Sequence, residues 1–491
     1  MTERLLSLPA YVASLAPRDL ADARRLTALV PEQATAIEYR LDLAEESIAP
    51  AALLDLDSRA MIVTYRSARE GGGFGGSSDE YRRLTFKAYE AGATVDVEHT
   101  RGLLADRGNF PDRRRVVVST HFPSGLPEDW GSTLSAMLST GAHAVKLVAG
   151  AADLTSSLAL AALQARQCDR SVAIFPMGPA SAPGRILSAL FGSSLLYGSV
   201  ERATARGQVS LRDLFTVYEV HRPRKSEALF GLVAADPSTS LSPLLHNALF
   251  RSRGLPYLYL PLPVSDFDHE KPRELLFDPP FRGFSVTRPW KSRAALAGAP
   301  SEDVVATRAA NALFLARGRW RAENTDVDGI FDPLADHDTG EGRTAVILGA
   351  GGAARAAIVA SRRLGYEVFV ASRRDEEADA LAAEFRVDSM AWEDVAASEA
   401  DLYINATPLG FREGDPSAVA STVLGHRPLV FDCVYRPDGS QTPTIEAARA
   451  ARCPTVDGLA MLAAQAVRQA RLFGTESVTL EEVSRLLRRQ V

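Results

Sequence analysis

Cysteine is scarce in this chain, which has three among its 491 residues. Cys168, Cys433 and Cys453 lie far apart, and their spacing matches no metal-ligand pattern. The sequence therefore predicts neither a bound metal nor a disulfide framework. Cysteines without a disulfide pattern favour a reducing compartment, so we expect a cytoplasmic protein.

Long apolar runs and a large net charge are also missing. No run reaches the roughly 18 apolar residues that span a bilayer, so the sequence predicts no membrane helix. The stretch LLSLPAYVASLA only faintly imitates a signal peptide, because Pro9 interrupts it and Arg4 alone precedes it. We interpret it as a buried first strand. The net charge of −6 gives no reason to expect binding to nucleic acid or to an anionic membrane. Nothing in the sequence indicates an oligomeric state.

Length and composition indicate a globular protein of several domains. As a soft prior, 491 residues correspond to about three domains. The chain is 46% hydrophobic and 24% charged, close to globular averages. It has no internal repeat. The glycine-rich stretch Gly71–Gly76, GGGFGG, predicts a mobile loop.

The first 222 residues predict a (β/α)₈ TIM barrel. Short apolar runs alternate with helical segments such as 18–30 and 79–92. Eight such units in about 220 residues are typical of this fold. The strand candidates are 4–10, 34–42, 60–67, 93–99, 116–122, 143–150, 172–178 and 194–200.

The remaining residues predict a two-lobed α/β protein. The charged segment His221–Glu227 contains Pro223 and predicts a linker. Residues 228–325 predict a substrate domain, and 326–457 predict a Rossmann-type NADP domain. Residues 458–491 have helical periodicity and are expected to complete the substrate domain.

The stretch Thr344–Ala357, TAVILGAGGAARAA, predicts a strand, a tight glycine turn and a helix. Gly349 permits the turn, Gly351 lets the backbone approach a pyrophosphate, and Ala354 allows close helix–strand packing. The free N–H groups at the start of the helix suit phosphates. The residues predicted to contact a dinucleotide here are Gly349, Ala350, Gly351, Gly352 and Ala353.

The end of the next strand-like run favours NADP over NAD. It reads Ser372-Arg373-Arg374, where an NAD site usually carries an acidic residue for the ribose 2′-hydroxyl. Two arginines suit a 2′-phosphate. The alternative is a structural glycine turn in another α/β unit, with an ordinary solvated arginine pair.

The strand ends of the predicted barrel carry a candidate Schiff-base site, because barrel enzymes do their chemistry there. Lys146 lies in an apolar strand, and a desolvated lysine near arginines can attack a ketone to form an imine. The alternative is a lysine that reaches the rim to keep its charge in water. His121 is equally compatible with a structural role. The candidates are Glu38, Arg40, Arg66, Glu70, His121, Lys146, Arg185 and Gln208.

This half resembles type I 3-dehydroquinate dehydratase over about residues 1–220. The resemblance rests on EYRLD, TYRSAREGG, VDVEH, STHF, AVKLV and the combination GRILSALFGS…YGS…GQ. It implies that Lys146 forms an imine with the substrate ketone, that His121 shuttles protons and that Glu70 orients His121. It also implies substrate contacts: Arg185 for the carboxylate, Glu38, Arg40 and Arg66 for the hydroxyls and the reacting end, and Thr204 and Gln208 on a closing loop.

The chain departs from that family in the closing loop. The usual serine-alanine-proline-glycine-glutamine is replaced by Thr204-Ala205-Arg206-Gly207-Gln208. Thr204 keeps the hydroxyl, but Arg206 stands where a proline would stiffen the loop. We therefore expect lid closure to differ from the family pattern.

The second half carries a candidate carboxylate site and a candidate acid–base pair. Ser240 and Ser242 come just before a predicted helix, and two hydroxyls beside a helix N-terminus can bind a carboxylate. The alternative, helix capping by serine, is compatible with this role. Lys291 and Asp326 come from separate loops. Such a pair can deliver a proton to the alkoxide that forms when hydride reduces a ketone; the alternative is a surface salt bridge.

Residues 228–491 resemble shikimate dehydrogenase. The resemblance rests on FGLVAADPSTSLSPLLHNALF, FSVTRPWK, RAANALF, AENTDVDG, NATPLG, FDCVYRPDGSQTP and VDGLAMLAAQA. It implies that Lys291 is the main acid–base group and that Asp326 is its partner. It also implies substrate contacts from Thr287, Asn311, Tyr435 and Gln465, and cofactor contacts from Asn405, Thr407 and Leu409. Three residues depart from the family and affect the expected substrate contacts: Ser285, Arg288 and Ala312.

Together the two resemblances imply a bifunctional enzyme of aromatic amino acid biosynthesis. The product of the first reaction, 3-dehydroshikimate, is the substrate of the second, which uses NADPH. The expected partners are these small molecules. Two alternatives stay open: a fusion whose second half oxidises quinate-like substrates with NAD, and a non-catalytic sensor of such metabolites.

Overall fold

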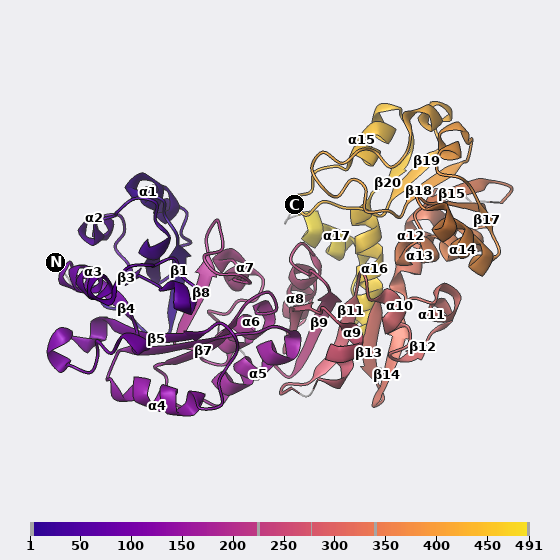
Figure 1. Ribbon diagram of the computed structural model, residues 1–491. Coiled ribbons are helices and arrows are strands. Elements are labelled where there is room, and N and C mark those ends of the chain that lie inside the picture. The colour runs from indigo at the N-terminus through magenta and orange to yellow at the C-terminus, as the bar shows by residue number, and fades with distance from the viewer. Residues whose placement is uncertain (1–3, 223–225, 276, 338–340, 489–491) are drawn as a thin grey trace. The chain divides into compact units, whose positions relative to one another are not determined.

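The computed structural model describes residues 4–222, 226–275, 277–337 and 341–488 (Figure 1). The chain divides into two compact units: residues 1–225 with 262–264, and the remainder. Part of the predicted linker, residues 223–225, lies outside the described residues. No helix within the described ranges is long and apolar enough to cross a membrane.

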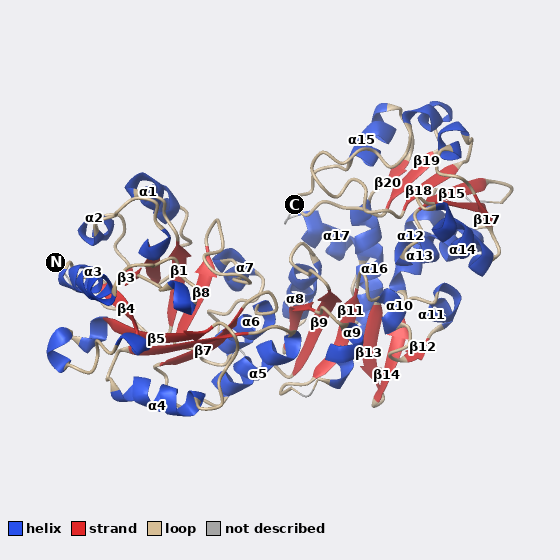
Figure 2. Ribbon diagram, in the orientation of Figure 1, coloured by secondary structure: helices blue, strands red, loops and turns tan. Residues whose placement is uncertain are grey.

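The first unit contains the predicted barrel, as Figure 2 shows by its strands with helices around them. Eight parallel strands follow the order β7-β6-β5-β4-β3-β2-β1-β8. Ser194 N donates to Val172 O at 3.1 Å, which brings the start of β8 to the start of β7 and nearly closes the sheet. The strands are β1 Ala10–Leu15, β2 Ala36–Arg40, β3 Ala60–Thr64, β4 Thr94–Glu98, β5 Val116–Phe122, β6 Ala144–Gly150, β7 Val172–Met177 and β8 Leu195–Ser199. The helices are α1 Leu20–Ala28, α2 Pro50–Leu54, α3 Ser78–Glu90, α4 Trp130–Ser139, α5 Leu154–Ala165, α6 Ala182–Leu190 and α7 Leu211–Thr216.

The first strand differs from the sequence prediction. It begins at Ala10 rather than at residue 4. Pro9 has no N–H to donate to a sheet ladder, so pairing starts after it. The buried Leu6 packs instead into the barrel core with residues such as Val12 and Ile62.

The glycine-rich stretch 71–76, which was predicted to be a mobile loop, is hydrogen-bonded to residues that follow β2 and β3. Phe74 N donates to Arg66 O at 2.9 Å, and Gly73 N donates to Asp42 Oδ2 at 3.0 Å. A Cβ at Gly72 would overlap the backbone of Arg66. The glycines therefore allow close packing here.

The first lobe of the second unit is built on a mixed six-stranded sheet, ordered β10-β9-β11-β13-β14-β12. The helices α16 and α17 pack with α8 through an apolar cluster that includes Leu245, Leu462 and Val483. The strands are β9 Ala228–Ala234, β10 Tyr257–Pro263, β11 Phe281–Val286, β12 Ala299–Pro300, β13 Ala312–Ala316 and β14 Arg319–Glu323. The helices are α8 Ser242–Ser252, α9 Phe267–Glu270, α10 Lys291–Ala294, α11 Glu302–Thr307, α12 Thr325–Ala335, α16 Gly458–Leu472 and α17 Leu480–Arg488.

The second lobe has the predicted Rossmann-type architecture. Its parallel sheet is ordered β17-β16-β15-β18-β19-β20, so the strand order reverses beside β15. Ligands of such sheets bind at this reversal, outside the carboxyl ends of the strands. The strands are β15 Thr344–Leu348, β16 Glu367–Ala371, β17 Asp388–Ser389, β18 Leu402–Asn405, β19 Leu429–Asp432 and β20 Thr455–Val456. The helices are α13 Gly352–Arg363, α14 Asp375–Phe385 and α15 Pro443–Ala450.

Candidate active sites

One cavity at the carboxyl ends of the barrel strands collects every site residue predicted for the first half. The strands bring these residues together because parallel strands end on the same face of a barrel. The predicted residues that line the cavity are Glu38, Arg40, Arg66, Glu70, His121, Lys146, Arg185, Thr204 and Gln208.

Lys146 is a buried residue of β6, and its Nζ lies among carboxylates. Its Nζ contacts Asp96 Oδ2 and lies 3.9 Å from Glu38 Oε1 and 4.6 Å from the centre of the Tyr197 ring. Asp96 also accepts a hydrogen bond from Arg66 Nη2 at 2.7 Å. Burial opposes ionisation of Asp96, but Arg66 and Lys146 hold the pKa of this carboxyl below its usual range. Asp96 is therefore an anion in direct contact with the amine.

His121 and Glu70 form a hydrogen-bonded pair on the same wall. Glu70 Oε2 lies 3.1 Å from His121 Nδ1 and accepts from Arg66 Nη1 at 2.8 Å. Burial raises the pKa of Glu70 to about 7 despite the nearby Arg66. Burial and the neighbouring cations Arg66 and Lys146 lower the pKa of His121 well below its usual value. His121 is thus a neutral imidazole at pH 7, and its Nε2 can accept a proton.

Arg185 is a buried cation that pairs with no carboxylate of the described residues. It is 6% exposed, and its guanidinium lies over the ring of Phe175, 4.9 Å from the centroid. Its Nε is buried and makes no hydrogen bond to any described residue. Burial lowers the pKa of Arg185 to about 10. A buried guanidinium with free donors fits a carboxylate on a ligand.

The loop that contains Thr204 and Gln208 is bonded across the cavity. Thr204 Oγ1 lies 2.7 Å from Ser14 Oγ, and Gln208 Oε1 accepts from Thr204 N at 2.9 Å. Arg206 holds the loop through its backbone, because its carbonyl accepts from Gly178 N at 3.2 Å. These bonds seat the loop on the strand ends without the proline of the family pattern.

Sequence reasoning missed Asp96, Ser14 and Tyr197 among the residues around the amine. A signal for Asp96 was present: Val95-Asp96-Val97-Glu98 places two carboxylates on one face of an otherwise apolar strand. A polar face on a barrel strand points to the interior, where charge needs a partner.

In the second unit, Lys291 and Asp326 lie in contact, and they come from two helices rather than from the separate loops that were predicted. Lys291 begins α10 and Asp326 lies in the first turn of α12, and Lys291 Nζ donates to Asp326 Oδ2. Asn311 Nδ2 donates to Asp326 Oδ1 at 2.8 Å and to Gln465 Oε1 at 3.0 Å. Asp326 is 3% exposed, so this pair is not a surface salt bridge.

The predicted carboxylate site lies at the start of α8. Ser240 Oγ accepts from Ser242 N at 3.2 Å, and Leu241 between them is the N-cap residue of α8. Tyr435 is hydrogen-bonded to Ser240. Thr287 follows β11 and is half-buried, four residues before Lys291. Of the departures from the family, Ser285 donates to Gln469 Oε1 at 2.7 Å.

The glycine turn after β15 leaves room for a ligand. Gly349 has φ +114°, which other residues rarely adopt, and a Cβ at Gly351 would meet no atom within 4 Å. The N-cap residue of α13 is Gly351, and no side chain within the described ranges caps this helix start. A Cβ at Gly352 would lie 3.0 Å from Lys291 Cδ. The glycine turn therefore lies next to Lys291. A cofactor bound at the turn would lie beside a ketone held at Lys291, as a reaction between the two requires.

The ends of β16 and β18 supply the other predicted cofactor residues. Ser372 is buried, whereas Arg373 and Arg374 are exposed, and Arg374 Nη2 pairs with Glu377 at 2.6 Å. Asn405 is fully buried, and its amide donates to Leu409 O at 3.0 Å and to Asp432 Oδ1 at 2.8 Å. Its side chain thus shapes the turn that presents the backbone at Thr407, Pro408 and Leu409. The remaining predicted turn residues, Ala350 and Ala353, flank Gly351 and Gly352.

Comparisons with known proteins match each half. The family described as type I 3-dehydroquinase matches residues 11–224, and the shikimate dehydrogenase substrate binding domain matches residues 232–313. A third family, NADP oxidoreductase coenzyme F420-dependent, matches residues 343–427.

Individual relatives match the whole chain or its second half. The chloroplastic bifunctional 3-dehydroquinate dehydratase/shikimate dehydrogenase of Arabidopsis thaliana is 27% identical over 442 residues, 84% of this chain and 72% of the relative. The shikimate dehydrogenase (NADP(+)) of Maridesulfovibrio salexigens is 32% identical over 51% of this chain and 92% of its own length. The dehydroquinate dehydratase and shikimate dehydrogenase structure from S. pombe AroM matches with a TM-score of 0.44 and 21% identity, over 99% of this chain and 98% of that one.

Proposed function

This chain belongs to the shikimate dehydrogenase family and carries a type I 3-dehydroquinate dehydratase in the same polypeptide, and from this premise we propose how its residues perform the two reactions. The enzyme dehydrates 3-dehydroquinate to 3-dehydroshikimate and reduces that product to shikimate with NADPH. The observation that carries the residue assignment is the convergence of Lys146, His121 and an unpaired Arg185 in one cavity.

In the dehydratase, Lys146 Nζ attacks the substrate ketone and water leaves, which gives a protonated imine. Asp96 stabilises this cation, since its carboxylate contacts Nζ. His121 takes the proton α to the imine, and the electron pair moves into the imine. As the pair returns, the β-hydroxyl leaves with the proton from His121. Hydrolysis of the imine then releases the product and restores the amine.

Protonation of Glu70 is expected to make the dehydration rate fall with pH near neutrality. Ionised Glu70 accepts the Nδ1 proton of His121 and leaves Nε2 as the base. Because burial raises the pKa of Glu70 to about 7, lowering the pH through 7 protonates it and removes that acceptor. We expect kcat/KM for 3-dehydroquinate to fall below about pH 7. Glu70→Gln should lower kcat and remove this fall in kcat/KM at acid pH. If the fall remains in the variant, a group other than Glu70 causes it.

In the dehydrogenase, Ser240 and Ser242 hold the substrate carboxylate at the start of α8. Bound NADPH supplies the hydride, and Lys291 donates the proton that the reduced carbonyl oxygen requires. Asp326 orients the ammonium of Lys291, and Asn311 with Gln465 holds Asp326 in place. The open space at Gly351 and the uncapped start of α13 fit a pyrophosphate.

The arginines after β16 are proposed to select NADPH. Arg373 and Arg374 are exposed at the strand end where a 2′-phosphate would lie. Replacing both with alanine should raise the KM for NADPH about ten- to hundredfold, the worth of a charge-assisted hydrogen bond. The KM for NADH, measured in the same preparation, should stay nearly unchanged. An equal rise in the KM for NADPH and for NADH would show that the arginines do not bind the 2′-phosphate.

A one-pot assay tests both activities of the chain. 3-Dehydroquinate and NADPH are mixed with the pure protein, and absorbance is followed for enone formation and for loss of NADPH. The assignment requires both signals, with enone appearing first.

We also propose a reducing compartment such as the cytoplasm, because the cysteines Cys168, Cys433 and Cys453 are all free.

A further inference from the structure

Arg40 lies in the barrel cavity, and a neighbouring carboxylate fixes its direction. Its Nε donates to Asp42 Oδ1 at 2.8 Å and its Nη2 donates to Asp42 Oδ2 at 2.7 Å. Asp42 lies in a single helical turn after β2, Leu41–Leu43, and its side chain is fully buried. With two nitrogens bound to Asp42, Nη1 is directed to Thr204 O of the loop across the cavity, at 3.5 Å.

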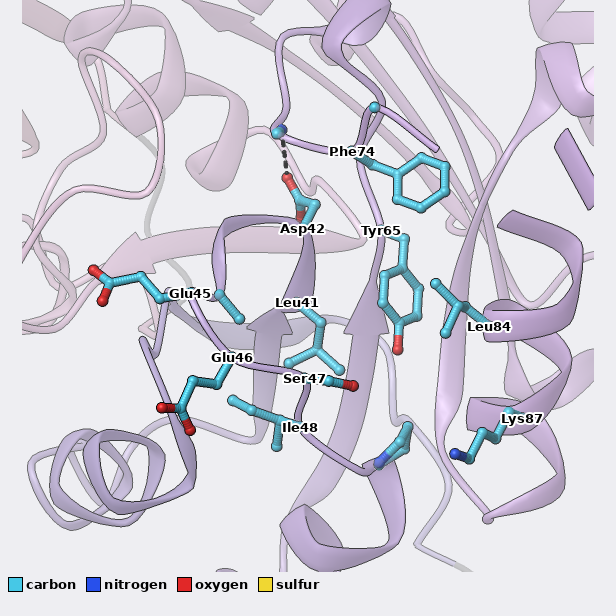
Figure 3. Close-up of a pocket in the computed structure, with 14 residues that line it drawn as sticks. Leu41, Asp42, Glu45, Glu46, Ser47, Ile48, Tyr65, Phe74, Leu84 and Lys87 are labelled. Carbon is cyan, nitrogen blue, oxygen red and sulfur yellow. Dashed lines mark hydrogen bonds between the residues drawn. The ribbon is translucent and has the colours of Figure 1, made fainter. Parts of the chain in front are cut away.

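The same carboxylate holds the glycine-rich stretch 71–76. Gly73 N donates to Asp42 Oδ2 at 3.0 Å, the bond drawn in Figure 3. A Cβ at Gly73 would overlap the carbonyl oxygen of Asp42, so only glycine packs this closely. Asp42 therefore joins the glycine-rich stretch to Arg40, and through Arg40 to the loop at Thr204.

Asp42 also lines a second cavity, of about 250 Å³, together with residues that include Leu41, Tyr65, Phe74 and Leu84 (Figure 3). Arg40 is not among the residues that line it, and the direction of its guanidinium is fixed by the two hydrogen bonds to Asp42.

We propose that Asp42 is a positioning residue of the dehydratase, which aims Arg40 at the substrate and couples the glycine-rich stretch to the loop at Thr204. This inference rests on the proposed role of Arg40 in binding substrate. An ionised carboxylate accepts all three hydrogen bonds at once. Asparagine has one acceptor oxygen and an NH₂ group that faces other donors, so it cannot hold both arginine nitrogens.

The chain contains a matched control for this arrangement. Asp57 binds Arg59 in the same two-residue geometry, with Nε to Oδ1 at 2.8 Å and Nη2 to Oδ2 at 2.6 Å. Neither residue lines the barrel cavity. Asp57→Asn breaks an ion pair of the same geometry in the same unit. It therefore shows how the loss of such a pair affects protein stability when no substrate-binding residue is involved.

The first test compares Asp42→Asn with Asp57→Asn in the full chain. Asp42→Asn should raise the KM for 3-dehydroquinate about tenfold or more, as loss of a charge-assisted hydrogen bond does, with a smaller change in kcat. Asp57→Asn should leave both constants within about twofold, because it breaks a partly exposed pair away from the barrel cavity. Asp42→Glu keeps the charge and should recover part of the KM. An unchanged KM in Asp42→Asn, or equal losses in both asparagine variants, would overturn the proposal.

A double variant separates this inference from the role of Arg40 itself. If Asp42 acts through Arg40, then Asp42→Asn should add no further rise in KM to a chain that carries Arg40→Ala. Additive losses would contradict positioning. An Arg40→Ala variant with normal KM would refute the role of Arg40, and impaired Arg40→Ala with normal Asp42→Asn would refute the role of Asp42 alone. Reduction of 3-dehydroshikimate by the same preparations shows that the rest of the chain is folded.

Discussion

Dehydration of 3-dehydroquinate is expected to cease when Lys146 is replaced with alanine, while reduction of 3-dehydroshikimate stays close to normal. Lys146 is the only lysine that lines the barrel cavity among the described residues, so no other amine can form the imine there. Removing an acid–base group costs about 10²–10⁴-fold in rate, and losing the covalent amine should cost at least as much. The loss should appear in kcat, because Arg185 still binds the carboxylate. Steady-state assays of each reaction on one preparation measure both.

Borohydride provides the direct check of the imine. Added with 3-dehydroquinate, it should reduce the imine to a stable secondary amine on Lys146, which peptide mapping locates. The Lys146→Ala protein should show no adduct. An adduct on another lysine, or none in the unmodified protein, would refute the Schiff base.

The second large effect is expected for Lys291→Ala, which should stop reduction and leave 3-dehydroshikimate to accumulate in the one-pot assay. The ammonium of Lys291 supplies the proton at the reacting oxygen, so kcat should fall about 10²–10⁴-fold. The KM for 3-dehydroshikimate should change little, since Ser240 and Ser242 are assigned to the carboxylate. NADPH consumption with supplied 3-dehydroshikimate measures the effect.

A matched lysine serves as the control for that experiment. Lys271 is exposed, and the one carboxylate it pairs with among the described residues is that of Glu274, at 3.6 Å, so Lys271→Ala should leave both reactions unchanged. If Lys291→Ala or Lys146→Ala silences both reactions in a folded chain, the assignment of one lysine to each reaction is wrong.

The sequence predicted the two architectures because each follows from patterns along the chain. Alternating apolar runs and helices specify parallel strands, and a glycine turn between strand and helix specifies the Rossmann lobe. The start of the first strand was misplaced because apolar character alone does not show where ladder pairing begins. Pro9 decides this point, since it cannot donate to a neighbouring strand.

The sequence could place candidate residues at strand ends, but it could not show which side chains contact one another. Parallel strands carry their ends to one face, so Lys146 and His121 were brought together by topology. Which carboxylate contacts the Lys146 amine depends on which side chains of β4 point into the barrel. The sequence did not show this, and Asp96 was missed. The role of Asn405 likewise depends on packing, because its amide turns inward to Asp432 rather than outward.

The buried guanidinium of Arg185, which has no anionic partner among the described residues, makes substrate affinity and protein stability compete at one side chain. A charge held out of water without a partner costs the empty barrel free energy that a bound carboxylate returns. Selection for heat resistance alone would favour an apolar side chain at this position, at the expense of substrate recognition. Engineering that stabilises this barrel should therefore leave residue 185 unchanged and seek its gains elsewhere.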